Sequence, residues 1–222
     1  MDEISPPQKS LTEQTYDILL NAICTGELSP GERINQDDIA SQLKVSRQPV
    51  NSAISILKAY GFVEDTGKRG VVVAQISPDQ FRSIYEFRSV VEPFAVRLAH
   101  YRKPDNAATL AKDMLYRGWS GVKSKDLGVQ IQIDFEFHAM IYDWSGNETI
   151  TTTMNNNWHH IRRAMSVTIR QGVSPEKSWQ EHQEIIDALM DNDVESAENS
   201  MRQHIEQAQH STASILSQIT KS

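Results

Sequence analysis

The sequence predicts a mainly α-helical protein in two parts, and two observations carry this prediction. From residue 77 onward, apolar residues recur with helical spacing, and no strand-like alternation stands out. The β-favouring runs fall instead between residues 62 and 73, where glycines interrupt them. Ser77 and Gln80 flank Pro78 as a capping box with proline at the first helical position, which is a strong helix start. We therefore expect two domains, 1–76 and 77–222.

The first part begins with a helix, a turn and a second, shorter helix. Residues 11–25 place apolar side chains on one helical face, and Gly26 ends that helix. The sequence LSPG at residues 28–31 is typical of a turn. Asn35 can cap the short helix that follows, in which Ile39, Ala40 and Leu43 face inward. Lys44 and Val45 then form a tight connection to the next element.

A third helix and a hairpin complete the first part. Ser46 is a good N-cap, Pro49 falls in the first turn, and Gly61 follows the last turn. Beyond it, residues 62–63 and 71–73 favour two strands joined around residues 64–70. The order of helix, helix, turn, helix and two-stranded wing is that of a winged helix-turn-helix.

The exposed start of the third predicted helix carries the side chains best suited to DNA. Short polar and cationic groups there can hydrogen-bond to base edges and phosphates, and they are Ser46, Arg47, Gln48 and Asn51. Lys68 and Arg69 would extend this surface at the tip of the wing. A capped amphipathic helix with one arginine is equally compatible with a purely structural helix, so the pattern by itself leaves both interpretations open.

The net charge of −7 argues against nonspecific polyanion binding by the whole surface. Residues 1–76 carry 7 Lys and Arg against 10 Asp and Glu, so the first part is acidic as well. A DNA-binding surface must therefore concentrate its cations locally. Modest affinity for each subunit follows, which favours dimerisation on DNA.

The second part is predicted as an antiparallel all-α bundle. Caps, glycines and prolines divide it into helices at residues 78–101, 104–118, 126–145, 147–171, 174–190 and 193–219. A polar loop is expected at residues 120–125, and Pro93 is expected to kink the first of these helices locally.

Three histidines and one aspartate fall on inward stripes of separate helices. Asp134 and His138 lie one turn apart in residues 126–145, whereas His182 and His204 lie in the last two helices. Each alone is more typical of a hydrogen-bonded core residue. Buried polar groups must be paired, however, and a divalent cation bound by three imidazoles and one carboxylate would satisfy all four. Their concurrence therefore favours a metal site.

Arg88 lies on the inward stripe of the first bundle helix and must have an anionic partner. Glu92, one turn further on, can supply that partner as an internal ion pair. The alternative is a carboxylate ligand that binds between the guanidinium and the metal. Asn157 is a further candidate hydrogen-bond partner for such a ligand.

The segment from LSPGERINQDD to GKRGVVVA resembles the DNA-binding domain of the GntR family of bacterial regulators. Its PG-x-R, VSR-x-PV and RG-x-x-V elements carry the resemblance. The resemblance implies that Arg33, Ser46, Arg47 and Gln48 touch phosphates or bases. It also implies that the wing residues Lys68, Arg69 and Gly70 approach the minor groove. Asn51 replaces an arginine frequent in the family and can pair with adenine instead of guanine, so the operator is expected to differ.

The second part resembles the FCD-type effector domain attached to many GntR-family regulators. The segments EFRSVVEPFAVRLA, DFEFHAMIYDWSGN, EHQEIIDALMDND and AENSMRQHI carry this resemblance. It implies a metal held by Asp134, His138, His182 and His204, a small organic acid as effector, and a homodimer. The expected metal is zinc, with nickel, manganese and iron as alternatives.

The expected function is therefore a metal-dependent, ligand-responsive repressor that binds a double-stranded DNA operator. The alternatives are a metalloenzyme that acts on a small carboxylate and a metal with a purely structural role. Cys24 is the only cysteine, and no apolar run is long enough for a membrane helix. We expect a cytoplasmic protein without a membrane partner.

Overall fold

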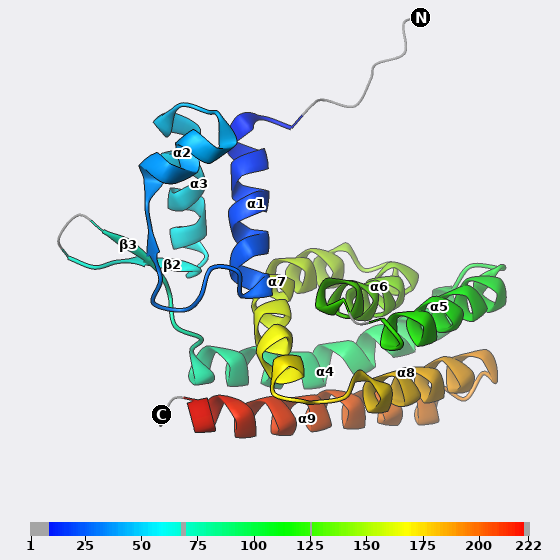
Figure 1. Cartoon of the computed structure of the whole chain (residues 1–222). Helices are drawn as coiled ribbons and strands as arrows, with labels where there is room; N and C mark the ends of the chain where they lie inside the picture. The colour runs from blue at the N-terminus through cyan, green and yellow to red at the C-terminus, as the bar shows by residue number, and fades with distance from the viewer. Residues whose placement is uncertain (1–8, 68–69, 125, 220–222) are drawn as a thin grey trace, which may run out of the picture. The chain divides into compact units, whose positions relative to one another are not determined.

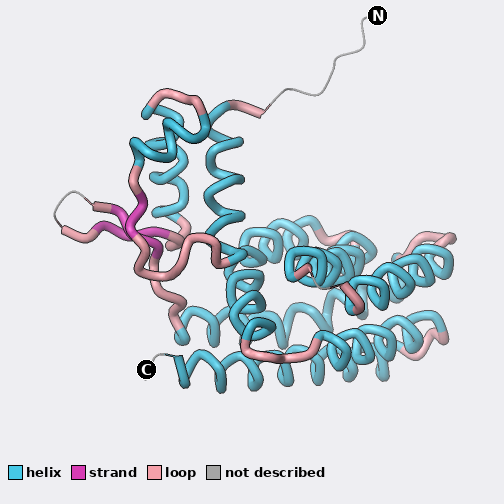
Figure 2. The backbone as a smooth tube through the Cα atoms, viewed as in Figure 1, coloured by secondary structure: helices cyan, strands magenta, loops and turns pink. Residues whose placement is uncertain are grey.

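The computed structural model describes residues 9–67, 70–124 and 126–219, and the chain divides into two compact units. The units are Met1–Gln75 and Ile76–Ser222, so the boundary lies one residue before the expected position. Each unit encloses its own hydrophobic core. The mainly α-helical fold class is confirmed, with a small sheet in the first unit (Figures 1 and 2).

Helix α1 (Leu11–Thr25) has a capping residue at each end. The Ser10 side chain accepts a hydrogen bond from the Glu13 backbone N–H, and the Glu13 carboxylate accepts one from the Ser10 backbone N–H. Gly26 ends the helix with a φ of 76°, a left-handed conformation that glycine adopts without a steric cost. Leu19, Leu20 and Ile23 form the buried face.

Helices α2 (Gln36–Leu43) and α3 (Arg47–Ala59) form the helix-turn-helix. Asn35 caps α2 by accepting a hydrogen bond from the Asp37 backbone N–H. The connection is tight because Lys44 adopts a left-handed conformation with a φ of 55°. The apolar face of α3 is buried as the sequence predicts, through Val50, Ala53, Ile54 and Leu57.

The strands of the first unit form an antiparallel sheet in the order β1-β3-β2. They span Arg33–Ile34 (β1), Val63–Asp65 (β2) and Val71–Val73 (β3). The predicted hairpin of β2 and β3 is confirmed. The sequence did not predict β1, which pairs with β3 as a third strand. Arg33 lies opposite Val72 in that pairing. Two residues are too few to show a strand pattern, so only the partner strand reveals β1.

The second unit is a bundle of long helices. They are α4 (Pro78–Arg102), α5 (Ala107–Val122), α6 (Leu127–Ser145), α7 (Glu148–Arg170), α8 (Pro175–Met190) and α9 (Val194–Ile219). Side-chain oxygens of Ser77, Asp126, Asn147 and Ser174 cap four of them. Helix α4 continues through Pro93.

Helix α5 differs from its prediction at both ends. It begins at Ala107, after Pro104, and it extends beyond Gly118, where the sequence suggested a stop. A Cβ atom at Gly118 would lie 1.9 Å from the Trp179 ring, and one at Gly121 would lie 2.8 Å from Ile133 Cγ2. These glycines therefore permit close helix packing, and tertiary contacts outweigh their low helix propensity.

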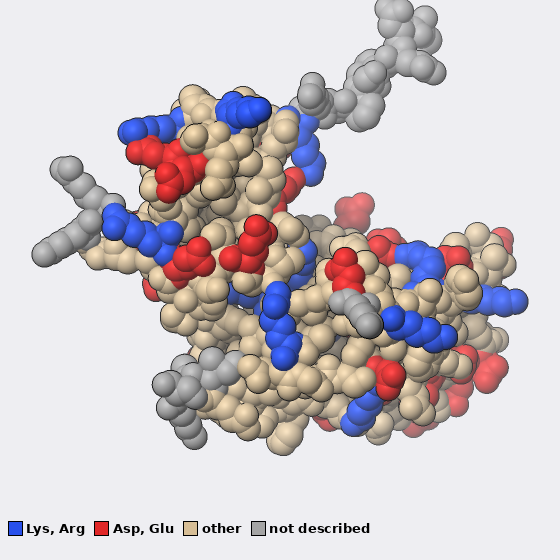
Figure 3. Space-filling view, in the orientation of Figure 1, with Lys and Arg blue, Asp and Glu red and all other residues tan. Residues whose placement is uncertain are grey.

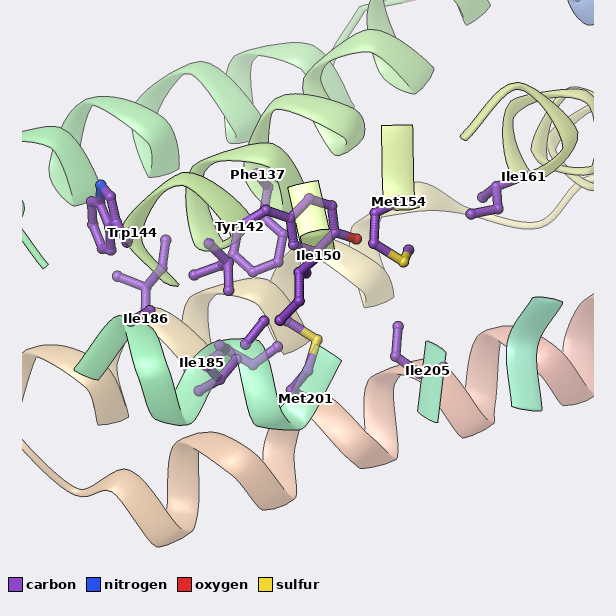
Figure 4. Close-up of a cluster of buried hydrophobic side chains, with 14 of the residues drawn as sticks. Phe137, Tyr142, Trp144, Ile150, Met154, Ile161, Ile185, Ile186, Met201 and Ile205 are labelled. Carbon is purple, nitrogen blue, oxygen red and sulfur yellow. The ribbon is translucent and has the colours of Figure 1, made fainter. Parts of the chain in front are cut away.

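The bundle core lies between α4, α6, α7, α8 and α9. Helix α4 packs along α6 and α9, and α8 packs against α5 and α9. Figure 4 shows aromatic side chains of α6, including Phe137 and Tyr142, among aliphatic and methionine side chains from α7, α8 and α9. This core fixes the inward faces of α6, α8 and α9, which carry the predicted metal ligands.

The described surface mixes both signs of charge. In Figure 3, acidic and basic side chains alternate over the visible face of each unit. This mixture agrees with 22 Lys and Arg against 29 Asp and Glu in the whole chain. Within the described ranges, none of the helices combines the length and the apolar character that a bilayer span requires.

Candidate functional site

Three histidines and an aspartate from three helices meet in the bundle interior. His182 Nε2 lies 3.2 Å from His204 Nε2 and 3.7 Å from Asp134 Oδ1. His138 Nε2 lies 3.9 Å from Asp134 Oδ2. His138 and His182 are fully buried, and only 4% of His204 and 7% of Asp134 are exposed. The structure thus brings together all four residues that the sequence singled out.

The donor set fits a divalent metal ion. Two nitrogens that bind one ion at about 2.1 Å lie about 3.0–3.4 Å apart, which matches the His182–His204 separation. His138 Nε2 is buried and has no hydrogen-bond partner in the described part of the chain. Leaving such an atom unpaired is costly. A shared ion would satisfy it together with the Nε2 atoms of the other two histidines.

His182 is held in the form that binds metals. Burial, followed by the neighbouring His204, His138 and Arg88, keeps the pKa of His182 well below its usual value. The imidazole is therefore neutral at pH 7, as metal ligation requires. Phe137 stacks on its ring at a centroid distance of 3.8 Å, and the Trp179 ring lies edge-on at 4.8 Å. These aromatic contacts fix the ring orientation.

Two glutamates contact the outer nitrogens of the histidine cluster, and the residue pattern of the sequence does not predict these contacts. Glu181 Oε2 lies 2.8 Å from His204 Nδ1 in a hydrogen bond. Glu92 Oε2 lies 2.7 Å from His138 Nδ1, although these two groups are not aligned as a hydrogen bond. Both contacts join residues far apart in sequence, so the spacing of residues within one helix cannot predict them.

Arg88 forms the internal ion pair with Glu92 that the sequence offered as one interpretation, and its side chain also contacts Tyr85. Its Nε donates to Glu92 Oε1 at 2.5 Å, and its guanidinium lies 4.6 Å from the centroid of the Tyr85 ring. Burial disfavours both charges of the pair. The attraction of Glu92 nevertheless raises the pKa of Arg88, and Arg88 and His138 lower the pKa of Glu92. Arg88 and Glu92 are therefore a charged, buried ion pair.

A cavity of about 300 Å³ opens beside this cluster. Its wall includes Arg88 and three of the four candidate metal ligands, namely Asp134, His138 and His204. Other polar side chains on the wall include Gln130, Thr168, Lys177, Ser178, Glu181 and Gln207. The volume lies at the lower end for ligand pockets, so the cavity suits a small molecule.

Asn157 does not contribute to this cavity. The structure places it outside the cavity wall, and its side-chain amide donates to the Thr153 backbone carbonyl at 2.9 Å. The expectation that Asn157 assists a ligand therefore has no support in the described structure. Asn157 is half-buried on α7, and its side-chain amide is satisfied by a hydrogen bond within that helix. The spacing of apolar residues could not reveal this hydrogen bond.

The residues predicted to contact DNA lie on the surface of the first unit. Ser46, Arg47, Gln48 and Asn51 are exposed at the start of α3, and Ser46 makes no side-chain capping bond. Arg33 is exposed on β1 beside β3. All five side chains therefore remain accessible to a partner of this unit.

The wing is only partly described. Lys68 and Arg69 lie outside the described residues, so the prediction for these two stays a prediction. Gly70 accepts a hydrogen bond from the Thr66 backbone N–H at 2.9 Å and precedes β3. A Cβ atom at Gly70 would lie 2.6 Å from Thr66 Oγ1, which explains why a glycine occupies this position.

Arg47 has an acidic partner that the sequence did not suggest. Its Nε lies 2.6 Å from Asp37 Oδ1, and its Nη2 donates to Asp37 Oδ2 at 2.9 Å. Both side chains are more than half exposed, so this bidentate pair contributes little to stability. It holds the guanidinium of α3 beside α2 and leaves it open to exchange with a phosphate or a base.

Two family models match the chain, one in each compact unit. The model of "Bacterial regulatory proteins, gntR family" matches residues 11–73. The FCD domain model matches residues 83–207, more than half of the chain. The metal-ligand candidates all lie within the second match. FCD domains are known to bind metals, which agrees with the three-histidine group.

Relatives and solved structures agree with these matches. The Nta operon transcriptional regulator of Aminobacter aminovorans is 32% identical over 178 residues, which cover 80% of this chain and 82% of that protein. A GntR transcriptional regulator from Rhodococcus sp. RHA1 superposes with a TM-score of 0.77 at 25% identity and covers 92% of this chain. E. coli McbR/YncC reaches a TM-score of 0.79 at 20% identity, over 96% of this chain. These similarities are to regulators of transcription and not to enzymes.

Proposed function

We infer that this chain, which belongs to the GntR family of bacterial regulatory proteins and has an FCD domain as its second part, is a metal-dependent repressor. We propose that it senses a small organic acid. That the chain is a ligand-responsive, DNA-binding transcriptional regulator follows from the family itself. The metal, the acid and the direction of regulation are our proposals. The convergence of three buried imidazoles beside a cavity supports the metal and the acid most directly.

We propose that Asp134, His138, His182 and His204 hold one divalent ion. Three imidazole nitrogens and a carboxylate oxygen suit zinc, and nickel, manganese and iron are the alternatives. When bound, the ion supplies a Lewis-acidic centre for a carboxylate ligand. The chain itself holds the histidine rings in place through the stacking of Phe137 and the acceptor Glu181.

The proposed effector is a small organic acid in the 300 Å³ cavity. The buried pair of Arg88 and Glu92 is neutral as a unit, and Lys177 and Glu181, 4.0 Å apart on the cavity wall, also offset each other. Asp134 then offsets only one charge of a divalent ion. A residual positive charge then favours an anionic ligand. Arg88 retains guanidinium donors on the cavity wall, and Gln130, Ser178 and Gln207 provide polar contacts. These features select a compact molecule with at least one carboxylate.

Helix α7 is the proposed route from the cavity towards the DNA-binding unit. Met165, Thr168 and Ile169 of α7 line the cavity. Two turns earlier, His160 Nε2 lies 3.4 Å from the Gln80 side-chain nitrogen, near the start of α4. Helix α4 is the first element after the unit boundary, so a shift of α7 on ligand binding would reach the connection to the first unit.

We propose that the regulator acts as a cytoplasmic homodimer that joins two copies of α4. Exposed apolar side chains form a stripe along one face of this helix, at helical spacing. They are Phe87, Val90, Phe94 and Tyr101. The same stripe on a second copy would be self-complementary across a two-fold axis. The dimer would present two copies of α3 to a near-palindromic operator, about one DNA turn apart.

Introducing a charge into this stripe should dissociate the dimer. Phe94→Glu would place two carboxylates in a closed apolar interface, and burying them without partners is costly. We expect a monomer by light scattering after gel filtration, together with weaker operator binding. Tyr116→Glu on α5, an equally simple change at an exposed aromatic residue, should leave the dimer intact. A Phe94→Glu protein that remains dimeric would place the interface elsewhere.

Arg47→Ala tests the proposed DNA contact. Removing a base or phosphate contact at the start of α3 should weaken operator binding by about 1–3 kcal/mol, while acid binding in the second unit stays unchanged. Fluorescence anisotropy with the DNA upstream of its own gene, against a random duplex, measures this difference. Lys58→Ala at the other end of α3 is the matched control. An equal loss in both variants, or no preference over random DNA in the parent, would contradict the assignment.

A further inference from the structure

We propose that Glu181 is a positioning residue that fixes His204 in the form that accepts a metal ion. The inference rests on the proposed metal site and concerns a residue outside the ligand set. Glu181 belongs to α8, whereas His204 belongs to α9, so their contact joins two helices that pack along each other. Replacing Glu181 should therefore lower metal affinity without removing any ligand.

The geometry determines which nitrogen of His204 carries the proton. Glu181 Oε2 lies 2.8 Å from His204 Nδ1. A carboxylate can only accept a hydrogen bond, so Nδ1 must be the donor. A neutral imidazole has one N–H, and the lone pair is then on Nε2. Nε2 is the atom that lies 3.2 Å from His182 Nε2 and faces the proposed ion.

Without this acceptor, the cluster has a competing arrangement. His204 could instead carry its proton on Nε2 and donate it to His182 Nε2 across the same 3.2 Å. Such a histidine pair would satisfy both buried atoms and would occupy the lone pair that a metal needs. Glu181 disfavours this arrangement because its carboxylate would then face the unprotonated Nδ1 atom of His204.

Within the described residues, neither of the other two candidate ligand histidines, His138 and His182, has an outer partner that can be replaced without disturbing another buried group. His182 Nδ1 has no hydrogen-bond partner there. Glu92 approaches His138 Nδ1, but it is fully buried and paired with Arg88, so its removal would unbalance a buried charge. Glu181 keeps 17% of its side chain exposed on the cavity wall, so water can replace it in a variant.

The test is zinc affinity of the full chain, measured by competition with a chromophoric chelator. Loss of an outer partner of a metal-bound histidine reduces affinity about 10–100-fold, which we expect for Glu181→Ala. Glu181→Gln retains an acceptor oxygen and should lose less. Glu184→Gln removes an exposed carboxylate three residues along α8 and should bind zinc like the parent. The melting temperature of each metal-free protein reports whether the fold is retained.

A second readout is independent of metal. Two-bond ¹H–¹⁵N spectra of the metal-free parent should show His204 protonated at Nδ1, and those of Glu181→Ala should show proton transfer to Nε2. If the parent binds no zinc, the proposed metal site is wrong and this inference falls with it. If the parent binds zinc and Glu181→Ala binds it equally well, the metal site stands and the role of Glu181 is wrong. If Glu184→Gln loses as much zinc affinity as Glu181→Ala, the loss comes from surface charge alone, which would also contradict the inference.

Discussion

Replacing His182 with alanine is expected to abolish metal binding and, with it, acid binding at the adjacent cavity. His182 Nε2 lies within 4 Å of both Asp134 and His204, so the variant loses the ligand that connects the others. The loss should exceed the roughly 100-fold limit typical of an outer-shell residue. Metal content by mass spectrometry of the purified protein, followed by calorimetric titration with zinc, measures it.

The control for this variant lies on α9. His210→Ala removes an exposed histidine and should retain one metal ion per chain. Because alanine at position 182 also leaves a void between Phe137 and Trp179, His182→Gln provides a second variant of more similar volume. If both His182 variants retain one equivalent of metal at parental affinity, the ion is held elsewhere or not at all.

Replacing Arg88 with alanine is expected to have the largest effect on stability. Glu92 would stay fully buried without its main counter-charge, and breaking a buried pair in this way costs about 3–5 kcal/mol. Urea unfolding of the metal-free protein measures this loss. Acid binding should weaken as well, because Arg88 is part of the cavity wall.

Helix α4 contains a matched control for this prediction. Arg97 pairs with Glu198, with 57% of the Arg97 side chain and 12% of the Glu198 side chain exposed. Because water can still reach Glu198, Arg97→Ala should cost clearly less than Arg88→Ala. The double variant Arg88→Met with Glu92→Leu removes both buried charges and should recover much of the stability but not the acid binding. If Arg88→Ala and Arg97→Ala lower the free energy of unfolding by equal, small amounts, Glu92 does not depend on Arg88 as a buried counter-charge, and the prediction is wrong.

Local sequence signals predicted most helices and the inward faces of the four candidate metal ligands because those features depend on spacing within one helix. Asp134 and His138 lie one turn apart, and His182 and His204 each fall on an apolar stripe that the bundle buries. The same signals could not reveal Glu181. It lies on the flank of α8, where a glutamate is usually solvated, and its partner comes from another helix. Its role depends on how α8 and α9 pack.

Elsewhere, tertiary packing overrode the local pattern. Gly118 looks like a helix end in the sequence and Gly121 falls in the predicted loop, yet both glycines allow α5 to approach Trp179 and Ile133. Strand β1 is too short to predict by itself and becomes visible only through its pairing with β3. The contact of Asp37 with Arg47 is likewise a product of the tight turn at Lys44, which brings α2 and α3 together.

The most direct test of the proposed metal site is an anomalous-scattering map of crystals of the purified protein, recorded at the absorption edge of the metal found by elemental analysis. We expect one peak per chain, about 2.0–2.2 Å from the Nε2 atoms of His138, His182 and His204 and from a carboxylate oxygen of Asp134. A metal-replete crystal with no peak among these four side chains, or with its peak at another site, would contradict it.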